Sequence, residues 1–352
     1  MMFFYLKEDV MEIKITLQES SYSIFTGRNI LKDIASFYNF SSHKVLIVTD
    51  SNIPSEYYSL IKEKINVVDT LILSPGEDSK SFNSYLKIQE KLLEHNFSRK
   101  DIVIALGGGV IGDLVGFASS TYKRGLTFIN IPTSTLSMID SSIGGKTAIN
   151  FNGIKNVIGT FYQPSLVLID FDLLKSLPQR HFNNGLIEAL KAGYIYDPSI
   201  LDLFSQDINS NLEEIIIKSI IVKKHFVEED EKEQNIRKIL NYGHTFGHGF
   251  ESLGGFNDSL YHGEAVGLGM LVVSKDKEKL ISYLNKLDIK YDFEISSQEL
   301  IKIILNDKKV DGKYIDLILV DNIGESYIKK TSIEDLVSIL EGGLEYVRRF
   351  RK

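Results

Sequence analysis

The stretch Asp101-Ile-Val-Ile-Ala-Leu-Gly-Gly-Gly-Val-Ile-Gly-Asp113 decides the fold of the first half of the chain. An apolar, β-rich run comes first, and Gly107, Gly109 and Gly112 then follow it in a G-x-G-x-x-G pattern. After a strand, such glycines let backbone N–H groups approach a pyrophosphate at the start of a helix. The pattern therefore predicts a dinucleotide-binding loop, with a glycine-rich turn that binds no ligand as the alternative.

Acidic and basic residues after the neighbouring strands could complete such a site. A ribose-binding acid is expected about 20 residues after the loop, but Pro-Thr-Ser occupies positions 132–134. Asp50, at the end of another expected strand, could supply this carboxylate instead. Glu77 and Lys80 follow a further strand, where they could contact ribose hydroxyls and phosphate, although a solvated turn explains them equally well.

Short β-rich runs alternate with helical patterns on both sides of the quoted stretch. Helices are predicted at 81–96 and from near 112, and strands at 45–49, 68–73, 102–106, 127–131 and 166–169. This alternation implies crossover connections and a parallel sheet. We therefore expect an α/β N-terminal Rossmann-like domain at 1–175, followed by a mostly α-helical C-terminal domain at 176–352.

From about residue 173 the periodicity becomes helical. Helices are predicted at 183–195, 212–229, 236–253, 262–284, 297–305 and 333–350. A small hairpin is expected before the last helix, with strands at 314–320 and 327–329 on either side of Gly324.

The composition of the 352 residues excludes several classes of protein. Hydrophobic residues make up 43% and charged residues 25%, which excludes a mainly disordered or collagen-like chain. A net charge of -7 argues against a nucleic-acid partner, and no apolar run is long enough to cross a membrane. The apolar N-terminus has no basic residue before it, unlike a signal peptide, so we expect a cytoplasmic protein. No cysteine is present, so any metal ion must be held by His, Asp or Glu.

Three histidines gather in the helical half, at positions 244, 248 and 262. His244 and His248 are four residues apart and therefore share one face of a helix. Either both bind a metal ion, or one binds it while the other transfers protons. His262 could complete a His/His/carboxylate site. The spacing leaves three candidates for the carboxylate: Glu188, Glu251 and Glu264.

Cations are frequent near these elements, but most lysines of such a chain are expected at the surface. Lys146 differs, because glycines and hydroxyl groups surround it in Ser141-Ser-Ile-Gly-Gly-Lys146-Thr. Such a composition suits the close approach of an anion.

Taken together, these motifs resemble the 3-dehydroquinate synthase family over about residues 75–324. The segments that carry the resemblance are Gly107-Gly-Gly-Val-Ile-Gly-Asp-Leu-Val-Gly-Phe117, Thr121-Tyr-Lys-Arg-Gly125, Asp140-Ser-Ser-Ile-Gly-Gly-Lys146, Lys155-Asn156, Gly185-Leu-Ile-Glu-Ala-Leu-Lys191, Asn241-Tyr-Gly-His-Thr-Phe-Gly-His248 and His262-Gly-Glu-Ala-Val266. Each segment is moderately specific, and all seven in this order leave little room for coincidence.

The resemblance implies a lyase of the shikimate pathway, which leads to chorismate and the aromatic amino acids. Its substrate would be a phosphorylated sugar acid, 3-deoxy-D-arabino-heptulosonate 7-phosphate, and its products 3-dehydroquinate and phosphate. The implied route is transient oxidation by NAD, phosphate elimination, reduction and intramolecular aldol closure. One divalent metal ion, zinc or cobalt, and a homodimer are implied as well.

The resemblance also implies roles for individual residues. The metal ligands would be Glu188, His244 and His262. Catalytic roles are implied for Asp140, Lys146, Glu233 and His248, with His248 near the departing phosphate. Substrate contacts are implied for Arg124, Lys146, Lys155, Asn156, Lys191, Lys223, Arg237, Asn241 and His248, of which Arg124 reaches across the dimer interface. Cofactor contacts are implied for Asp50, Glu77, Lys80, Gly108, Gly109, Val110, Ile111, Gly112, Asp113, Thr133, Ser134, Lys146 and Lys155. Either Lys308 or Lys309 should also touch the substrate.

Two positions depart from the family pattern, and three other functions compete. Ser134 replaces the second threonine of a Thr-Thr pair but retains a hydroxyl, and 151–154 differ from the usual loop before Lys155. Another sugar-phosphate cyclase, such as a 2-deoxy-scyllo-inosose synthase, acts on a substrate without a carboxylate, so the retained cations favour 3-dehydroquinate synthase. An alcohol dehydrogenase related to glycerol dehydrogenase needs no phosphate-binding cluster. A non-catalytic NAD-binding regulator would not need the metal and acid/base residues.

Overall fold

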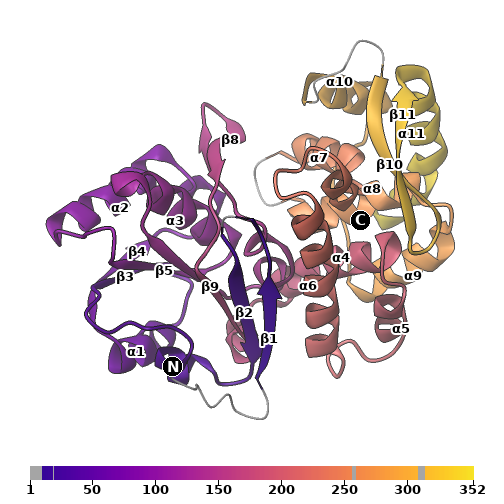
Figure 1. The fold of residues 1–352 in the computed structure, drawn as a ribbon. Helices are drawn as coiled ribbons and strands as arrows, with labels where there is room; N and C mark the ends of the chain where they lie inside the picture. Colours follow the sequence, from indigo (N-terminus) through magenta and orange to yellow (C-terminus); the bar gives the residue numbers. More distant parts are fainter. Residues whose placement is uncertain (1–9, 19, 256–258, 308–313) are drawn as a thin grey trace. The chain divides into compact units, whose positions relative to one another are not determined.

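A computed structural model of the chain describes residues 10–18, 20–255, 259–307 and 314–352. The chain divides into two compact units, Met1–Pro178 and Gln179–Lys352 (Figure 1). The first unit is built on a β-sheet and the second is mainly helical, which confirms the predicted fold class. Among the described helices, none has the length and apolar character that a membrane span requires.

The first unit contains a seven-stranded sheet of order β1-β2-β9-β6-β5-β3-β4. Its strands are β1 (Met11–Ile15), β2 (Tyr22–Gly27), β3 (Val45–Asp50), β4 (Val67–Leu73), β5 (Ile102–Gly107), β6 (Thr127–Pro132) and β9 (Leu166–Asp170). All pairings are parallel except that of β1 with β2. The prediction of a parallel sheet is therefore right for the five predicted strands, whereas β1 and β2 lay outside it. All six residues of β5 are buried, because this apolar strand lies between β6 and β3.

Helices cover both faces of this sheet (Figure 1). The helix α1 (Ser55–Lys64) lies on one face, and α2 (Phe82–Glu94) and α3 (Gly109–Thr121) lie on the other. A core cluster joins α2 and α3 to the strands, with Leu92, Leu114 and Val103 fully buried in it. The central strands and α3 therefore form one apolar layer that holds the glycine-rich loop in place.

A separate hairpin, β7 (Lys146–Phe151) and β8 (Ile154–Phe161), packs against α3. Its two-residue turn is Asn152-Gly153, with φ angles of 48° and 76°. An Asn-Gly pair between two strands is a strong signal for such a turn, because both residues tolerate positive φ. The hairpin thus gives a definite shape to the 151–154 loop, which differs from the family pattern.

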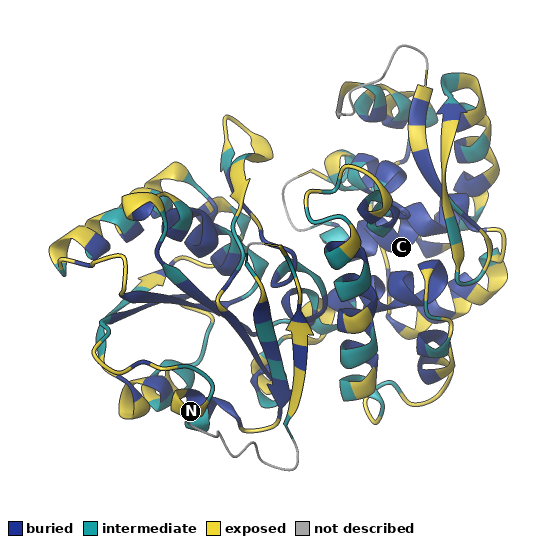
Figure 2. Cartoon of the chain, in the orientation of Figure 1, coloured by how far each residue is buried: buried dark blue, intermediate teal, exposed yellow. Residues whose placement is uncertain are grey.

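The second unit holds helices and one small hairpin. Its elements are α4 (Gln179–Ile195), α5 (Ser199–Ser205), α6 (Leu212–Glu229), α7 (His244–Leu253), α8 (His262–Val273), α9 (Lys277–Lys286), α10 (Ser297–Asp307), β10 (Tyr314–Asn322), β11 (Glu325–Ser332) and α11 (Ile333–Val347). The helix α8 is buried from Gly263 to Val273 and packs against α4, α7 and α11 (Figure 2). The predicted hairpin around Gly324 is confirmed.

Two predicted helices are each broken in two, so these predictions were wrong. The segment 236–253 forms a 3₁₀ helix, η6 (Ile236–Asn241), followed by α7, with Gly243 between them at φ 79°. A Cβ at Gly243 would lie 2.8 Å from the carbonyl oxygen of Val266 on α8, so close packing and the left-handed backbone both require glycine. The segment 262–284 breaks where Asp276 accepts a hydrogen bond from the Lys279 N–H and begins α9.

Candidate active site

In the first unit, the glycine-rich loop lies at the carboxyl end of β5. The sheet order places β4 on one side of β3 and β5 on the other, so the direction of winding reverses between β3 and β5. Ligands of such sheets bind at this reversal, beyond the carboxyl ends of the strands. Asp50 ends β3 and Gly107 ends β5, so both residues flank that point.

The helix α3 begins at Gly109, three residues before the predicted start near 112, because Gly108 is its N-cap. Gly108 offers no capping side chain, so the first N–H groups of α3 are not capped from that position. A Cβ at Gly109 would lie 2.9 Å from Ser141 Oγ, and one at Gly112 would lie 3.0 Å from Asn130 Nδ2. The glycines are therefore needed for close packing around the loop. The Gly112 N–H donates to the Gly108 carbonyl oxygen at 3.1 Å, so the N–H groups of the first turn of α3, Gly109 to Ile111, are the ones that can meet an anion.

Lys80 connects the loop to the β7–β8 hairpin. Its Nζ donates to Asp113 Oδ2 at 2.5 Å and to Asn156 Oδ1, and Lys80 is buried. Asn150 continues this network: its Nδ2 donates to Glu77 Oε1 at 2.8 Å, and its Oδ1 accepts from the Asn156 N–H at 2.9 Å. The structure thus brings Glu77, Lys80, Asp113 and Asn156 together. Sequence reasoning missed Asn150, although it lies on the same strand as Lys146.

The other predicted residues of the first unit occupy two regions. Thr133 and Ser134 follow β6 at the same edge of the sheet, and the Ser134 and Ser137 hydroxyls lie 2.8 Å apart. Burial raises the pKa of Asp50 above its usual value, despite the N–H of Asn52 donating to this carboxylate. Arg124 lies after the far end of α3, just before β6 begins, which is the opposite edge of the sheet.

Lys146, Lys155 and Asp140 complete the predicted set in the first unit. Lys146 begins β7 and Lys155 lies on β8, and both are exposed. Asp140 lies in the short π-helical turn Ser137–Ser141 and is partly buried. Lys146 and Lys155 thus belong to the β7–β8 hairpin, and the turn that holds Asp140 packs against α3.

In the second unit, Glu188, His244 and His262 form a compact group of candidate metal ligands. One ligand atom from each residue lies within 4.8 Å of the other two. Nε2 of His244 and Nε2 of His262 are each 4.0 Å from Glu188 Oε1. The three residues come from α4, α7 and α8 respectively, so the packing of three helices builds this group.

Hydrogen bonds on the far side of each imidazole orient the two rings. Nδ1 of His244 donates to the carbonyl oxygen of Tyr242 at 3.2 Å. Nδ1 of His262 donates to Glu251 Oε2 at 3.3 Å. Because each Nδ1 carries the proton, each Nε2 presents a lone pair towards Glu188. Carboxylates and backbone carbonyls commonly hold metal-binding histidines in this way.

The charges around the group fit a bound divalent cation. Glu188 is buried, Lys191 pairs with its Oε2, and its Oε1 has no hydrogen-bond partner. A buried carboxylate oxygen without a partner is costly unless a cation or donor satisfies it. Two imidazoles and a carboxylate are a common ligand set of catalytic zinc, and they leave coordination positions open. The residues present therefore fit the metal ion that the resemblance implies.

The two imidazoles differ in their response to this environment. Burial, and then the charge of Lys191, hold the pKa of His244 well below its usual value, so this ring is neutral at pH 7. Burial also lowers the pKa of His262, but the hydrogen bond and charge of Glu251, with the charge of Glu188, outweigh it and raise the pKa. A cation bound at Nε2 of His262 would have to displace the second ring proton, which the charges of Glu251 and Glu188 favour.

His248 lies beside this group without belonging to the triangle of ligand atoms. Its ring centroid is 5.4 Å from that of His244 and 5.9 Å from that of His262. The spacing argument left open whether His248 binds metal, and the geometry favours Glu188 as the third ligand. The other two candidate carboxylates have different partners: Glu251 holds His262, and Glu264 pairs with Arg180.

The remaining predicted residues of the second unit lie on α6, on η6 and in the segment between them. Lys223 and Arg237 are both buried, and Arg237 Nη1 donates to the carbonyl oxygen of Glu231. Asn241 Nδ2 donates to Glu233 Oε1 at 2.8 Å, with Glu233 at φ 56°. The helix η6 packs against α6 and α4. Lys308 and Lys309 lie outside the described residues.

Models of one protein family match most of the chain. The model described as 3-dehydroquinate synthase N-terminal matches residues 70–184. The model described as 3-dehydroquinate synthase C-terminal matches residues 185–310. The two matches are adjacent and include all the motifs that carry the resemblance up to residue 266.

Solved structures share the fold at low sequence identity. A 2-deoxy-scyllo-inosose synthase, complexed with carbaglucose-6-phosphate, NAD+ and Co2+, aligns with a TM-score of 0.83 at 22% identity, covering 95% of this chain and 100% of that chain. A 2-epi-5-epi-valiolone synthase from Streptomyces hygroscopicus subsp. jinggangensis, with NAD+ and Zn2+ bound, gives 0.83 at 24% identity, covering 95% and 98%. These likenesses establish the architecture.

Curated relatives are more similar in sequence. The 3-dehydroquinate synthase of Clostridium botulinum (strain Alaska E43 / Type E3) is 38% identical over 346 residues, which cover 92% of this chain and 99% of the relative. That of Dictyoglomus thermophilum is 38% identical over 356 residues, which cover 95% and 99%. With the two family models and these nearly full-length matches, the chain belongs to the 3-dehydroquinate synthase family.

Proposed function

We propose that the protein is a 3-dehydroquinate synthase, which converts 3-deoxy-D-arabino-heptulosonate 7-phosphate into 3-dehydroquinate and phosphate. The observation that carries this proposal is the group Glu188, His244 and His262, with its unpartnered carboxylate oxygen. Family membership supplies the reaction, and this group supplies a site suited to it. We assign NAD binding to 1–175, and metal and substrate binding to 176–352.

Both cofactors have residues that fit them. When bound, NAD would accept a hydride from the substrate carbon that carries a secondary hydroxyl and return it later, and zinc or cobalt would stabilise charge on the substrate oxygens. Glu188, His244 and His262 would hold the metal ion. The loop from Gly108 to Asp113 would receive the pyrophosphate, with the N–H groups of the first turn of α3 as donors.

Lys191 and His248 are the groups of this cluster that remain for proton and charge control. Lys191 occupies one oxygen of Glu188, so it leaves Oε1 to face the two Nε2 atoms. His248 has its ring next to both ligand histidines, so one of its ring nitrogens can exchange a proton with a departing phosphate. The requirement for both groups explains why the site contains more than the three proposed metal ligands.

Two buried cations suit a substrate that carries two anionic groups. Lys223 and Arg237 are buried, and solvent and salt screen the attraction between a buried cation and an anion only weakly. The Asn241–Glu233 pair offers both a donor and an acceptor to hydroxyl groups. In the first unit, Lys146 and Lys155 are the exposed cations that we assign to the same substrate.

The position of Arg124 supports a homodimer. This residue lies at the opposite edge of the sheet from the glycine-rich loop, at φ 64°. It follows Lys123, which also has positive φ, and two such non-glycine residues in succession are uncommon. A second copy of the chain would allow Arg124 to reach a site that its own unit does not bring to it.

Product identification with purified protein tests the proposed function. The protein is incubated with the heptulosonate phosphate, a trace of NAD and Co2+, and products are identified by NMR. We expect 3-dehydroquinate and phosphate in equal amounts, with many turnovers per NAD, because the reaction returns the hydride. Stoichiometric accumulation of NADH would indicate a dehydrogenase, and an absence of phosphate release would reject catalysis of this reaction.

Glucose 6-phosphate distinguishes the other cyclase reaction. It has the phosphate but lacks the carboxylate, so the cations left unmatched should make it a poor substrate. Arg237→Ala should reduce turnover of the heptulosonate phosphate far more than NAD affinity. Efficient cyclisation of glucose 6-phosphate, or an Arg237→Ala variant with normal kinetics, would indicate a 2-deoxy-scyllo-inosose synthase instead.

A further inference from the structure

Three residues of α4 lie on one face of this helix and meet the first turn of α8. Arg180, Asn184 and Glu188 are spaced four residues apart, so they form a stripe in which successive residues rise by about 6 Å. His262 is the first residue of α8. Glu188 approaches His262 directly, and the other two residues contact its neighbours in sequence.

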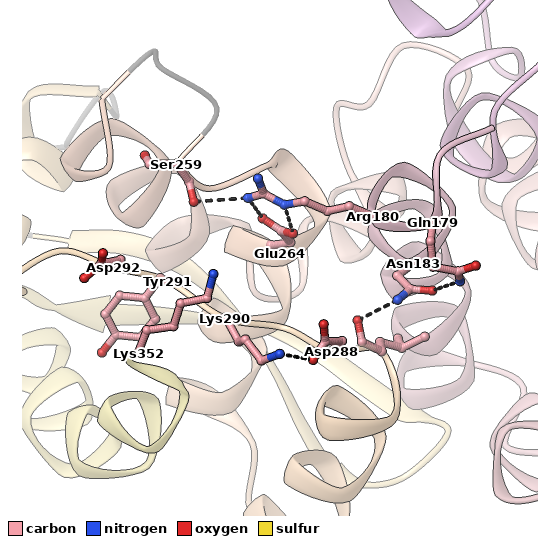
Figure 3. Close-up of a pocket in the computed structure, with 11 residues that line it drawn as sticks. Gln179, Arg180, Asn183, Ser259, Glu264, Asp288, Lys290, Tyr291, Asp292 and Lys352 are labelled. Carbon is pink, nitrogen blue, oxygen red and sulfur yellow. Dashed lines mark hydrogen bonds and ion pairs between the residues drawn. The ribbon is translucent and has the colours of Figure 1, made fainter.

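Glu264 receives most of these contacts. Arg180 donates to both of its oxygens, from Nε to Oε1 and from Nη2 to Oε2, each at 2.7 Å (Figure 3). The Tyr261 N–H donates to Oε2 at 2.8 Å. The Glu264 side chain is only 4% exposed, so this charge-assisted fork operates largely away from solvent. The pair therefore fixes the residues on both sides of His262.

Further contacts remove the remaining freedom of this turn. The Glu264 N–H donates to Asn184 Oδ1 at 3.2 Å. A Cβ at Gly263 would collide with the carbonyl oxygen of Asn184, so α8 can approach α4 only with glycine there. The Arg180 guanidinium also lies over the Tyr261 ring, 4.1 Å from its centroid. Residues 261, 263 and 264 are thus all held against α4.

We propose that the Arg180–Glu264 pair is a positioning clamp for the metal site. The clamp sets the distance between α4, which carries Glu188, and the start of α8, which carries His262. Because the two candidate ligand atoms are 4.0 Å apart, a small shift of α8 along or away from α4 would change the coordination geometry. This inference rests on the proposed function only in requiring that Glu188 and His262 share a metal ion.

The surroundings of Arg180 make the clamp testable without removing core packing. Arg180 borders a cavity of about 420 Å³, and its side chain is 45% exposed (Figure 3). Substituting it leaves no buried void, but it removes the fork from Glu264. Arg180→Lys keeps the positive charge without the planar fork, and Glu264→Gln keeps the shape without the negative charge.

Arg349 is a matched control in the same unit. Its Nη1 lies 2.8 Å from Glu278 Oε1, and its guanidinium lies over the Tyr346 ring at 4.7 Å. Its side chain is 48% exposed, close to the 45% of Arg180. Arg349→Ala thus removes the same kinds of interaction from a position whose described partners, Glu278 and Tyr346, lie on α9 and α11.

The experiment measures Co2+ binding to metal-free full-length protein by competition with a chelating dye. We expect Arg180→Ala to weaken Co2+ about 10-fold, at the low end of the effects known for residues that orient ligands. The visible absorption spectrum of bound Co2+ should change as well, because the ligand geometry changes. The Co2+ affinity of Arg180→Lys should lie between those of Arg180→Ala and the wild type, and the affinity of Arg349→Ala should match that of the wild type. NAD affinity should stay within about twofold throughout.

Urea unfolding of the metal-free proteins separates positioning from stability. If Arg180→Ala and Glu264→Gln are less stable but bind Co2+ with wild-type affinity and spectrum, the pair is only structural and the clamp is rejected. If Arg180→Ala does not fold, the same comparison is made with Arg180→Lys and Glu264→Gln. A wild-type protein that binds no Co2+ would overturn the proposed metal site together with the clamp, whereas normal wild-type binding and unchanged variants would overturn the clamp alone.

Discussion

In the first unit, the proposed cofactor loop is a continuous run of residues between β5 and α3, whereas the candidate metal ligands of the second unit come from three helices. The loop depends on backbone N–H groups, so its signal is the glycine spacing itself. The metal group depends on side chains, so it exists only after α4, α7 and α8 have packed. A local motif can thus be read directly from sequence, but a site made by convergence requires the packed structure.

His262→Ala should have the largest effect and should affect only the second unit. It removes one of the three proposed ligands. Loss of the metal ion would also remove several kcal/mol of charge stabilisation, so turnover should fall roughly a thousandfold. Metal content, measured by mass spectrometry, should fall with it. The control is His225→Ala, since the described partners of His225 are the rings of Tyr196 and Phe226, away from the three candidate ligands. Full metal content in the His262 variant would reject the ligand assignment.

Lys80→Met should have the next largest effect, in the first unit. Asp113, with a side chain 19% exposed, would lose the cation that contacts it, which should lower the free energy of unfolding by about 2 kcal/mol. The loop and the hairpin would separate, so we expect NAD affinity and turnover to fall by about 100-fold at unchanged metal content. Isothermal titration with NAD measures this. Lys91→Met is the control, because its pairs with Asp69 and Glu94 lie at the surface. A loss of metal rather than NAD would show that the two sites are not built independently.

Glu251→Gln should have a smaller effect, and it tests how much the charge of Glu251 contributes to metal binding by His262. The amide oxygen can still accept from Nδ1 of His262, but the charge that strengthens this ligand is lost. Co2+ affinity should fall by about 10-fold, as measured by dye competition. Glu228→Gln, which affects a helical surface pair with Lys224, should leave the affinity unchanged. An unaltered affinity in Glu251→Gln would mean that α8 alone orients His262.

Ser134→Thr should have the smallest effect. It restores the family residue, and the hydroxyl 2.8 Å from that of Ser137 is kept, so NAD affinity should stay within about twofold. Ser134→Ala removes the hydroxyl and should weaken NAD by about fivefold, the equivalent of one ordinary hydrogen bond. Equal affinities in both variants would show that this hydroxyl does not contact the cofactor.

Strand and helix positions in both units were largely predictable because their signals are local. The strand predicted at 102–106 is confirmed as β5, and the helix predicted at 212–229 matches α6. The break at Gly243 was not predictable, since the helical pattern continues through it. That break results from the close approach of α8 at Val266, which no local pattern records. The Asn152-Gly153 turn was predictable, because its signal is contained in two residues.

The choice among three carboxylates shows more clearly what the sequence alone cannot decide. Glu188, Glu251 and Glu264 are equivalent on spacing, and only the resemblance favoured Glu188. In the structure, Glu264 is satisfied by Arg180, Glu251 holds an imidazole, and Glu188 keeps an oxygen without a partner. Arg180 and Asn184 were missed, although their spacing from Glu188 is helical and could have suggested a shared face.

Residue types and their order along the chain were therefore enough to predict the α/β and helical parts, the glycine-rich loop and the family. Apolar periodicity and glycine spacing act on neighbouring residues, so they need no knowledge of packing. The partners of Glu188, Lys80 and Arg180 depended on tertiary structure. A buried charge takes its role from the groups that reach it, and helices or strands distant in sequence supply those groups.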